Sequence, residues 1–488
     1  MPSYSFERLS AQENRFLLLE SPETPMHATS VAIYRAGPLA TSNGGVDIAR
    51  LKRFIGSLLH QVPRYRQKLK TVPIENHPVW IDDPHFNLDF HVRHAALPRP
   101  GSVEELKNKV ARIMVQPLDR ARPLWETWVI EQLEGDLFAI VSKVHHCVLD
   151  PSQTADLSQI CMSPNAGRQI AKSPPFQPRP EPTGAELLRG EWSRRAALPG
   201  KILGGWREIR SESESLVDGV RSGIDALGGW LTSGPSETPL NGRIGPHRRL
   251  EWLTFALGDL KAIHQSLRCT INDAVLTIVT GAVRHFLLHR HTDPNEIDFR
   301  VSIPLSVRGK DDEAGEATSE VRSFIIDLPI GESDAKAQLA AITDQTKNLK
   351  TASAVLGAEM IMAVAEWTPS VLFGRAARVL AGDLPVNLSV SNVPGPQQPL
   401  YLLGSQMVEW FGAAPLSKHT GLAISLVSYN GRVCWGFSAD RDLVPDLVQL
   451  VHYVREALED LAHAAGIEVK GLPPEVLPPA DAPHGAPS

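Results

Sequence analysis

The chain has 488 residues, of which 42% are hydrophobic and 21% are charged, a composition typical of a globular protein. This length exceeds one ordinary core, so two lobes of roughly 200 residues each are expected. The formal net charge of −6 argues against a nucleic-acid-binding protein, which normally carries a large basic excess.

Cysteine usage and hydropathy indicate a cytoplasmic protein. The four cysteines are scattered without a CxxC pair, which predicts neither a disulfide framework nor a zinc site and fits a reducing compartment. The N-terminal residues have no apolar core of the kind that signal peptides carry, and we find no run of about 18 apolar residues. Lipid substrates would therefore have to be met at a surface.

The first part of the chain carries a strand pair that runs into two histidines. Trp128–Leu133 and Leu137–Val144 are predicted strands, joined by a short Glu-Gly-Asp turn. A strand that ends in His145 and His146 places imidazoles at the edge of a sheet, where a cleft can form. Histidine titrates nearest neutral pH, so it suits proton transfer from an alcohol. Asp150 would orient the imidazole or pair with a distant arginine.

The HHxxxD spacing is the feature that favours a functional site here. A histidine pair alone is usually structural in a chain with 17 histidines, but the full pattern is much rarer by chance. A zinc site is a weaker alternative, because no third ligand stands at a familiar spacing. Cys147 is a conceivable nucleophile, yet its neighbours supply no distinct activating partner.

A proline-rich stretch that begins at Pro164 disfavours both helix and inner strand, and it predicts a linker over residues 164–240. Within it, apolar residues from Leu216 to Leu231 recur at helical spacing and form one stripe. Such a helix would lie either in a groove of its own protein or on a membrane or lipid-droplet surface. The last residues, from Pro473 onward, are rich in Pro and Ala and are expected to be disordered.

The part between the linker and the tail mixes helices and strands. Residues 272–289 predict a mostly buried helix, with Asn272 and Asp273 near its start. Leu426–Tyr429 and Arg432–Phe437 predict a hairpin, because the Asn-Gly pair between them is the strongest short hairpin signal.

Five further segments occur in a fixed order around the histidines, and together with them carry a family resemblance. They are Pro123-Leu124-Trp125-Glu126, the stretch Asn241–Arg249, Asn272-Asp273, Pro304-Leu305-Ser306-Val307-Arg308, and the block Asn387–Pro396 that reads NLSVSNVPGP. In these blocks the chain resembles the bacterial wax ester synthase and diacylglycerol acyltransferase family, within the HHxxxD superfamily of coenzyme-A-dependent acyltransferases.

The resemblance implies an α/β (α+β) fold of two coenzyme-A-dependent acyltransferase-like lobes. Each lobe would be a mixed sheet flanked by helices, with a tunnel between the two. The expected domains are an N-terminal lobe at 1–163 with HHxxxD, the linker at 164–240, a C-terminal lobe at 241–466 and a disordered tail at 467–488. The family also implies a cytoplasmic protein peripheral to membranes or lipid inclusions.

The resemblance further implies an O-acyltransferase of EC class 2.3.1. It would transfer a fatty acyl group from acyl-CoA to diacylglycerol, giving triacylglycerol, or to a long-chain alcohol, giving a wax ester. His146 would be the general base, in a catalytic set with His145 and Asp150. Asn272 is a candidate oxyanion donor, although a helix cap is at least as good an interpretation. Arg308 would brace the motif loop through Asp150. No cofactor or metal is expected, because acyl-CoA is a substrate.

One residue departs from the family motif. The family has glycine after the motif aspartate, whereas this chain has Pro151, which fixes φ and has no N–H to donate. Proline also pushes Asp150 toward an extended conformation. The alternative function is therefore a catalytically weak or silent homologue that binds acyl-CoA or lipid. A peptide-forming condensation domain shares the HHxxxD logic, but the linker and the PLWE and SNVPGP blocks speak against it.

Overall fold

The computed structural model describes residues 6–42, 44–149, 156–196, 235–308, 319–351 and 386–472. The helices in these ranges are α1 (Ala11–Leu19), α2 (Ile48–Leu58), α3 (Leu88–His91), α4 (Val103–Val115), α5 (Leu157–Cys161), α6 (Gly184–Ala196), α9 (Leu257–Leu267), α10 (Ile271–His289), α11 (Ala335–Thr351) and α14 (Leu447–Ala464). Short 3₁₀ turns are η1 (Gly37–Leu39), η2 (Leu59–Gln61), η3 (Pro63–Arg66), η4 (His146–Val148) and η5 (Pro294–Glu296).

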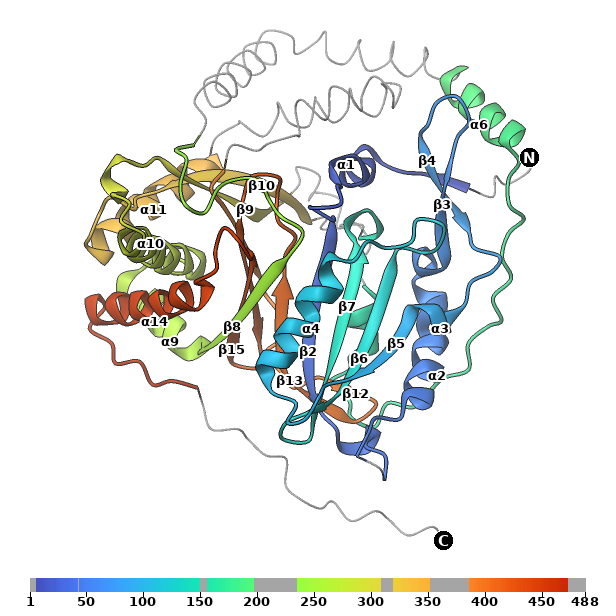
Figure 1. Cartoon of the computed structure of the whole chain (residues 1–488), viewed down its shortest axis with the longest axis horizontal. Helices are drawn as coiled ribbons and strands as arrows, with labels where there is room; N and C mark the ends of the chain where they lie inside the picture. The colour runs from blue at the N-terminus through green and yellow to red at the C-terminus, as the bar shows by residue number, and fades with distance from the viewer. Residues whose placement is uncertain are drawn as a thin grey trace.

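The chain folds into two lobes, each built on a six-stranded mixed sheet flanked by helices (Figure 1). The first sheet has the order β12-β13-β2-β7-β6-β5, and its strands are β2 (His27–Arg35), β5 (Val92–Ala96), β6 (Trp125–Leu133), β7 (Leu137–His145), β12 (Tyr401–Leu402) and β13 (Ser405–Ala413). Only its edge pair β5–β6 is parallel. The predicted two-lobed α/β fold is confirmed, whereas the tunnel stays a prediction.

The second sheet has the order β10-β9-β11-β14-β15-β8. Its strands are β8 (Arg248–Ala256), β9 (Phe299–Arg308), β10 (Ser319–Leu328), β11 (Leu388–Val393), β14 (Leu422–Tyr429) and β15 (Arg432–Asp440). Strand β11 pairs in parallel with both of its neighbours, β9 and β14, and the other pairs are antiparallel. A three-stranded sheet of β1 (Phe6–Arg8), β4 (Pro78–Asp82) and β3 (Gln67–Thr71) completes the described strands.

Local sequence signals explain where several elements begin and turn. Helix α1 starts with a capping box in which Ser10 and Glu13 each satisfy the other's backbone N–H. The hairpin predicted between β14 and β15 is confirmed, and both turn residues have positive φ, 46° at Asn430 and 77° at Gly431. This is the combination that a tight hairpin turn needs, because it matches the twist of the flanking strands.

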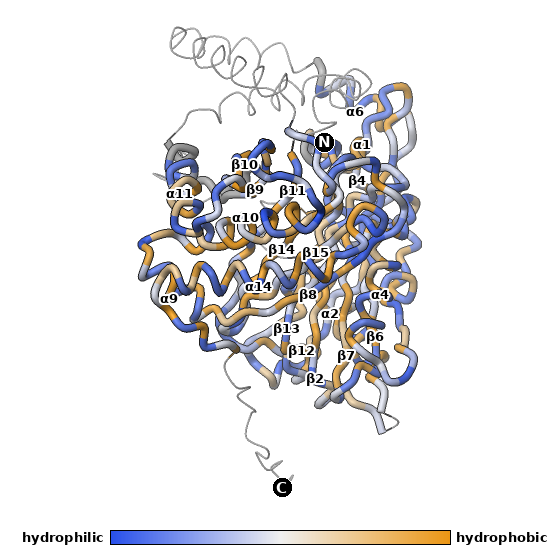
Figure 2. Tube along the Cα trace, turned by 60° about the vertical axis from the view of Figure 1, so that its left-hand side comes forward, coloured by the Kyte–Doolittle hydropathy of each residue, from blue (hydrophilic) through white to orange (hydrophobic). Residues whose placement is uncertain are grey.

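The predicted helix at 272–289 is confirmed as α10, the central helix of the C-terminal lobe. It packs against α9, α11 and α14. Among the described residues it alone has the length and composition to cross a membrane, but 67% of the tested window is buried inside the protein. We therefore interpret its apolar character as that of a core helix. Figure 2 shows how hydrophobic residues follow the helices and strands of this interior.

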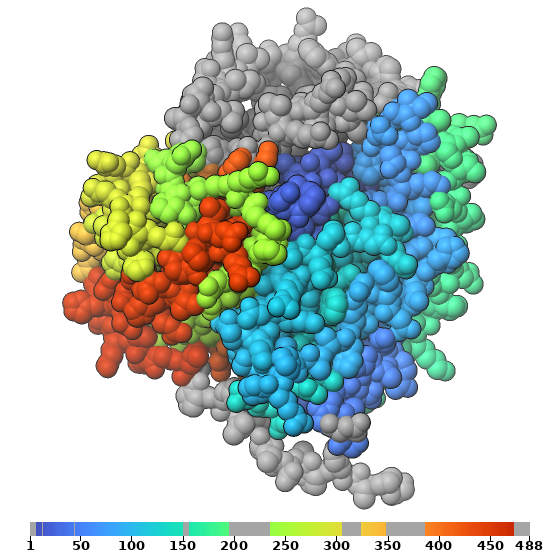
Figure 3. Space-filling model, viewed as in Figure 1, coloured from blue at the N-terminus to red at the C-terminus, as the bar shows by residue number. Residues whose placement is uncertain are grey.

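The two sheets are not separate along the chain. Strands β12 and β13 lie beyond residue 241, yet β13 pairs with β2 of the first sheet. The domain division expected at that residue is therefore crossed by a strand from the second half. Backbones meet closely there, since a Cβ at Gly436 of β15 would lie 1.9 Å from the carbonyl oxygen of Gly412 in β13. Figure 3 shows the two lobes in continuous contact along this seam.

Candidate active site

Strand pairing positions the motif histidines at the end of β7. His145 is the last residue of this strand and lies opposite His27 of β2. Its backbone N–H donates to the carbonyl of Leu124, which belongs to the PLWE block (3.0 Å). The chain then enters the turn η4, where the N–H of His146 donates to the carbonyl of Met26 (2.9 Å). The two histidines therefore sit on fixed backbone, one inside the sheet and one just beyond its end.

His146 has an imidazole that the described part of the chain does not hydrogen-bond. Its ring stacks on Phe16 of α1, with 4.9 Å between ring centroids and 23° between planes. The side chain remains partly exposed. Desolvation lowers the pKa of His146 to about 4, and the neighbouring rings of His145 and His27 lower it further. The ring is therefore neutral at pH 7 and has a free lone pair with which to accept a proton.

His145 is placed differently, because both of its ring nitrogens already face groups of the protein. The side chain is 1% exposed. Its Nδ1 accepts the backbone N–H of Cys147 (3.1 Å), and its Nε2 lies 3.5 Å from Oε1 of Glu20. The sequence grouped both histidines as catalytic, whereas this geometry makes His145 a support of the turn. Its expected catalytic role is untested, but no lone pair is left over for a substrate.

A buried carboxylate gathers the cluster from the end of α1. Oε1 of Glu20 lies 3.4 Å from Nε2 of His27, and Oε2 accepts a hydrogen bond from Arg120 (2.6 Å). Burial alone would raise the pKa of Glu20, but the contacts with His145, His27 and Arg120 outweigh it and hold the pKa well below its usual range. The carboxylate is therefore ionised throughout the working pH range.

Beyond the motif, the far end of its loop is tied to the N-terminal lobe. Residues 150–155 lie outside the described residues, so Asp150 and Pro151 stay predictions. The loop resumes at Asp156, which accepts a hydrogen bond from the buried hydroxyl of Tyr65. The carbonyl of Tyr65 in turn accepts the indole N–H of Trp125 (2.8 Å), again in the PLWE block. The PLWE block thus supports both ends of the motif loop.

Phe16, Glu20, His27 and Tyr65 were all missed by sequence reasoning. Each is more than 80 residues from His146 and carries no spacing signal that links it to the motif. The only available signal was indirect. Glu20 and His27 flank a Pro-rich connection to a predicted strand, and polar residues that are buried beside two histidines become visible as a group only once the sheet is assembled.

The remaining predicted residues lie in the C-terminal lobe. Asn272 is a half-buried residue in the first turn of α10, and the cap of that helix is Thr270, in a capping box with Asp273. The alternative interpretation of Asn272 as a helix cap is therefore wrong, and its oxyanion role stays a prediction. Arg308 ends β9, but its side chain lies outside the described residues, so its pairing with Asp150 is also a prediction.

Cysteine and metal chemistry find little support at this site. Cys147 is fully buried, and burial, together with Glu13 and Glu20, raises the pKa of its thiol well above the usual range. A thiol that stays protonated is a poor nucleophile. Within the described ranges, no group of three or more His, Cys, Asp or Glu side chains is arranged to hold a metal ion.

Comparison with known proteins decides the family. Residues 9–275 match the wax ester synthase/diacylglycerol acyltransferase catalytic domain, and residues 319–462 match the C-terminal domain of the same family. This protein belongs to the wax ester synthase/diacylglycerol acyltransferase family. The prediction from the sequence is confirmed, and with it the assignment of the chain to the acyltransferases.

Two relatives and two solved structures illustrate the similarity. A Mycobacterium tuberculosis protein (strain H37Rv) assigned as a diacylglycerol O-acyltransferase, Rv1760, is 31% identical and covers 96% of this chain and 92% of its own length. The tgs1 protein of the same strain, assigned the same activity, is 29% identical over 84% of this chain and 87% of its own. The wax ester synthase/diacylglycerol acyltransferase of Marinobacter aquaeolei VT8 superposes with a TM-score of 0.64 at 22% identity, covering 94% and 100%. The first condensation domain of the calcium-dependent antibiotic synthetase shares the fold, with a TM-score of 0.57 at 15% identity and coverage of 96% and 99%.

The family's NxxxSNVPGP block proves to be architectural where the structure describes it. The side chain of Asn387 is fully buried just before β11, and its amide donates to Ser236 O (2.8 Å) and to Asn241 Oδ1 (2.9 Å). Its oxygen accepts the N–H of Arg300 (2.8 Å). Further on, a Cβ at Gly395 would lie 2.2 Å from the carbonyl oxygen of Ser428, so only glycine fits there.

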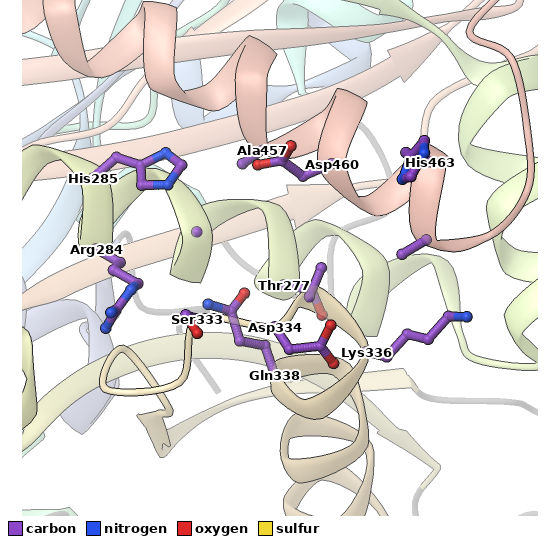
Figure 4. Close-up of a pocket in the computed structure, with 13 residues that line it drawn as sticks. Thr277, Arg284, His285, Ser333, Asp334, Lys336, Gln338, Ala457, Asp460 and His463 are labelled. Atoms are coloured by element: carbon purple, nitrogen blue, oxygen red, sulfur yellow. The ribbon is translucent and has the colours of Figure 1, made fainter.

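A polar cavity of about 380 Å³ lies in the C-terminal lobe of this acyltransferase, between α10, α11 and α14 (Figure 4). Arg284 and His285 line one end, and Lys336 and His463 line the other (Figure 4). Both guanidinium contacts that Arg284 makes are to backbone carbonyls of residues 330 and 331. The cavity belongs to the helical layer and contains none of the motif residues, so we do not assign the reaction to it.

Proposed function

We propose that this protein transfers a fatty acyl group from acyl-CoA to the hydroxyl of a lipid alcohol, with His146 as the general base. The observation that carries the proposal is the imidazole of His146. It is neutral, it is free of hydrogen bonds from the described residues, and a fixed turn presents it under Phe16. A general base needs these properties, because it must hold an unused lone pair at the working pH.

The reaction needs no covalent enzyme intermediate. The substrate hydroxyl gives its proton to His146 while its oxygen attacks the thioester carbonyl and forms a C–O bond. The tetrahedral intermediate then collapses, the C–S bond breaks, and the imidazolium returns the proton to the departing thiolate of coenzyme A. The products are one ester and one free thiol. Asn272 is the proposed donor to the oxyanion, in a role that hydrogen-bond donors commonly play in acyl transfer.

We further propose diacylglycerol and long-chain alcohols as the acceptors. The family name covers both activities, and the relatives from Mycobacterium tuberculosis carry the diacylglycerol assignment. Both acceptors are held in membranes or lipid inclusions, so the protein would work in the cytoplasm as a peripheral protein on such a surface. We propose no cofactor, because acyl-CoA supplies the activated acyl group.

The test is a transfer assay on the full-length protein. Palmitoyl-CoA is mixed with hexadecanol or with dipalmitoylglycerol in detergent micelles, and free thiol and ester product are measured together. We expect thiol release that depends on the acceptor, with one ester formed for each thiol. Thiol release that ignores the acceptor would make the protein a thioesterase. Binding of palmitoyl-CoA with no thiol release from either mixture would support the silent homologue instead.

A further inference from the structure

The carboxylate of Glu20 lies opposite the first motif histidine, although it comes from the end of a different element. Glu20 terminates α1, and its backbone N–H donates to the carbonyl of Phe16 (3.2 Å). The same helix therefore supplies both the ring that stacks on His146 and the carboxylate that faces His145. Arg120 holds that carboxylate from the outer side. The arrangement connects α1 to the turn through two contacts.

The hydrogen bond from Cys147 dictates where His145 carries its proton. A neutral imidazole has one N–H and one lone pair. Because Nδ1 accepts the backbone N–H of Cys147, the ring proton must be on Nε2, the nitrogen that faces Glu20 at 3.5 Å. In the other tautomer, two N–H groups would point at each other at the start of η4, and a lone pair would face a carboxylate. The ionised Glu20 therefore favours the tautomer that keeps the turn closed.

We propose that Glu20 is a positioning residue that fixes the tautomer of His145 and thereby holds the turn that presents His146. This inference rests on the proposed role of His146 as the base. Glu20 touches neither His146 nor any substrate in this scheme. It acts on the reaction only through the ring of His145 and the N–H of Cys147, so losing its charge should slow the chemical step more than it weakens substrate binding.

The first arm of the test compares two matched variants of α1. Glu20→Gln keeps the shape but removes the charge, and we expect kcat to fall about 10- to 100-fold, as is common when a group that orients a catalytic residue is lost. The KM for palmitoyl-CoA should change little. Glu13→Gln is the control, because Glu13 lies in the same helix, is similarly buried and contacts Ser10 and Trp80 instead. A Glu20→Gln variant with the kcat of the wild type would overturn the proposal.

The second arm asks whether Glu20 acts through His145. In His145→Asn the side-chain oxygen can take the place of Nδ1 and accept the N–H of Cys147, and an amide has no tautomer to control. Adding Glu20→Gln to this variant should then cost no further kcat. A loss in the double variant that equals the product of the two single losses would show that Glu20 works by another route.

A third arm does not depend on turnover. In ¹⁵N-histidine-labelled protein, the His145 ring, identified by its absence in His145→Asn, should show an unprotonated Nδ1 and a protonated Nε2. Glu20→Gln should shift both signals toward a mixture of tautomers, and Glu13→Gln should not. Unchanged signals in Glu20→Gln would sink the inference. If the wild type shows no acceptor-dependent thiol release, the proposed function fails, while this spectrum still decides what Glu20 does.

Discussion

The end of β7 and the start of β11 both carry buried polar residues from family motifs, but they use their hydrogen bonds differently. Around Asn387 both amide donors and the carbonyl oxygen are engaged by other protein groups. Around His146 the neighbours are held in place, while the imidazole itself receives no hydrogen bond from the described residues. Resemblance to a family marks both regions equally, and the state of the hydrogen bonds separates chemistry from architecture.

This comparison makes opposite demands on the two regions. Changing the group with the free lone pair should reduce turnover and leave folding nearly intact. Changing a saturated group should lower stability first, because each lost partner leaves a buried donor or acceptor unsatisfied. Variants in the two regions therefore sharpen the comparison when activity and unfolding are measured on the same samples.

The largest effect is expected for His146→Ala. Removing a general base typically costs about 10²- to 10⁴-fold in rate, and we expect a fall of that size in kcat with little change in the thermal unfolding midpoint. His452→Ala is the control, because His452 is an exposed residue of α14 that contacts only Glu456 and Tyr453 in its surroundings. Equal thiol release by His146→Ala and the wild type would remove His146 from the chemistry.

The next largest effect is on stability, at Gly395. The added methyl of Gly395→Ala meets the carbonyl oxygen of Ser428, so the backbone must move, and we expect the free energy of unfolding to fall by about 3 kcal/mol. Gly431→Ala is the matched control. Its φ is +77° but no atom lies within 4 Å of the new methyl, so only backbone strain of about 1 kcal/mol is expected. Urea denaturation of both variants measures the difference, and equal losses would contradict the predicted clash.

A smaller loss is expected for Asn387→Ala. It removes the partner of the Arg300 N–H and of the Asn241 and Ser236 oxygens, and we expect the free energy of unfolding to drop by about 2 kcal/mol. The kcat of the folded fraction should stay near that of the wild type. Asn108→Ala, in the exposed face of α4, is the control. A variant that keeps its stability but loses turnover would place Asn387 in the reaction and break the comparison.

The sequence predicted what local chemistry decides. Alternation and turn residues predicted β6, β7 and the β14–β15 hairpin, because their pairing partners are neighbours in the chain. Helix α10 followed from an apolar run of suitable length. Its cap was also readable, since Thr270 and Asp273 stand at the capping-box spacing, but Asn272 was chosen for its place in a motif.

Contacts between distant parts of the chain could not be predicted. Strand β13 joins β2, where Gly412 pairs with Ser30, and nothing local distinguishes it from a strand of the second sheet. The same holds for the candidate site. His146 was found from its spacing to His145 and Asp150, whereas Glu20 and Phe16 reach it only because α1 packs against η4. Tertiary packing, which leaves no periodic trace, supplied the environment that lowers the pKa.

The pH dependence of kcat/KM tests most directly whether a neutral His146 is the base. The pKa of His146 lies near 4 in the folded protein and near 6.5 in the unfolded chain. Its contribution to stability is therefore complete above about pH 6.5 and is lost as the pH falls from there to about 4. Samples must accordingly recover full activity when they are returned to pH 7.5. Acyl-pantetheine is run beside acyl-CoA, because it lacks the ionisable phosphates of the coenzyme.

We predict that kcat/KM stays level from pH 8 to about pH 5 and falls to half near pH 4, since only the protonated ring is inactive. A half-point near pH 6.5 would mean that the ring is solvated as in water. A rate that rises on acidification would mean that the imidazolium is the active form, and it would contradict the account.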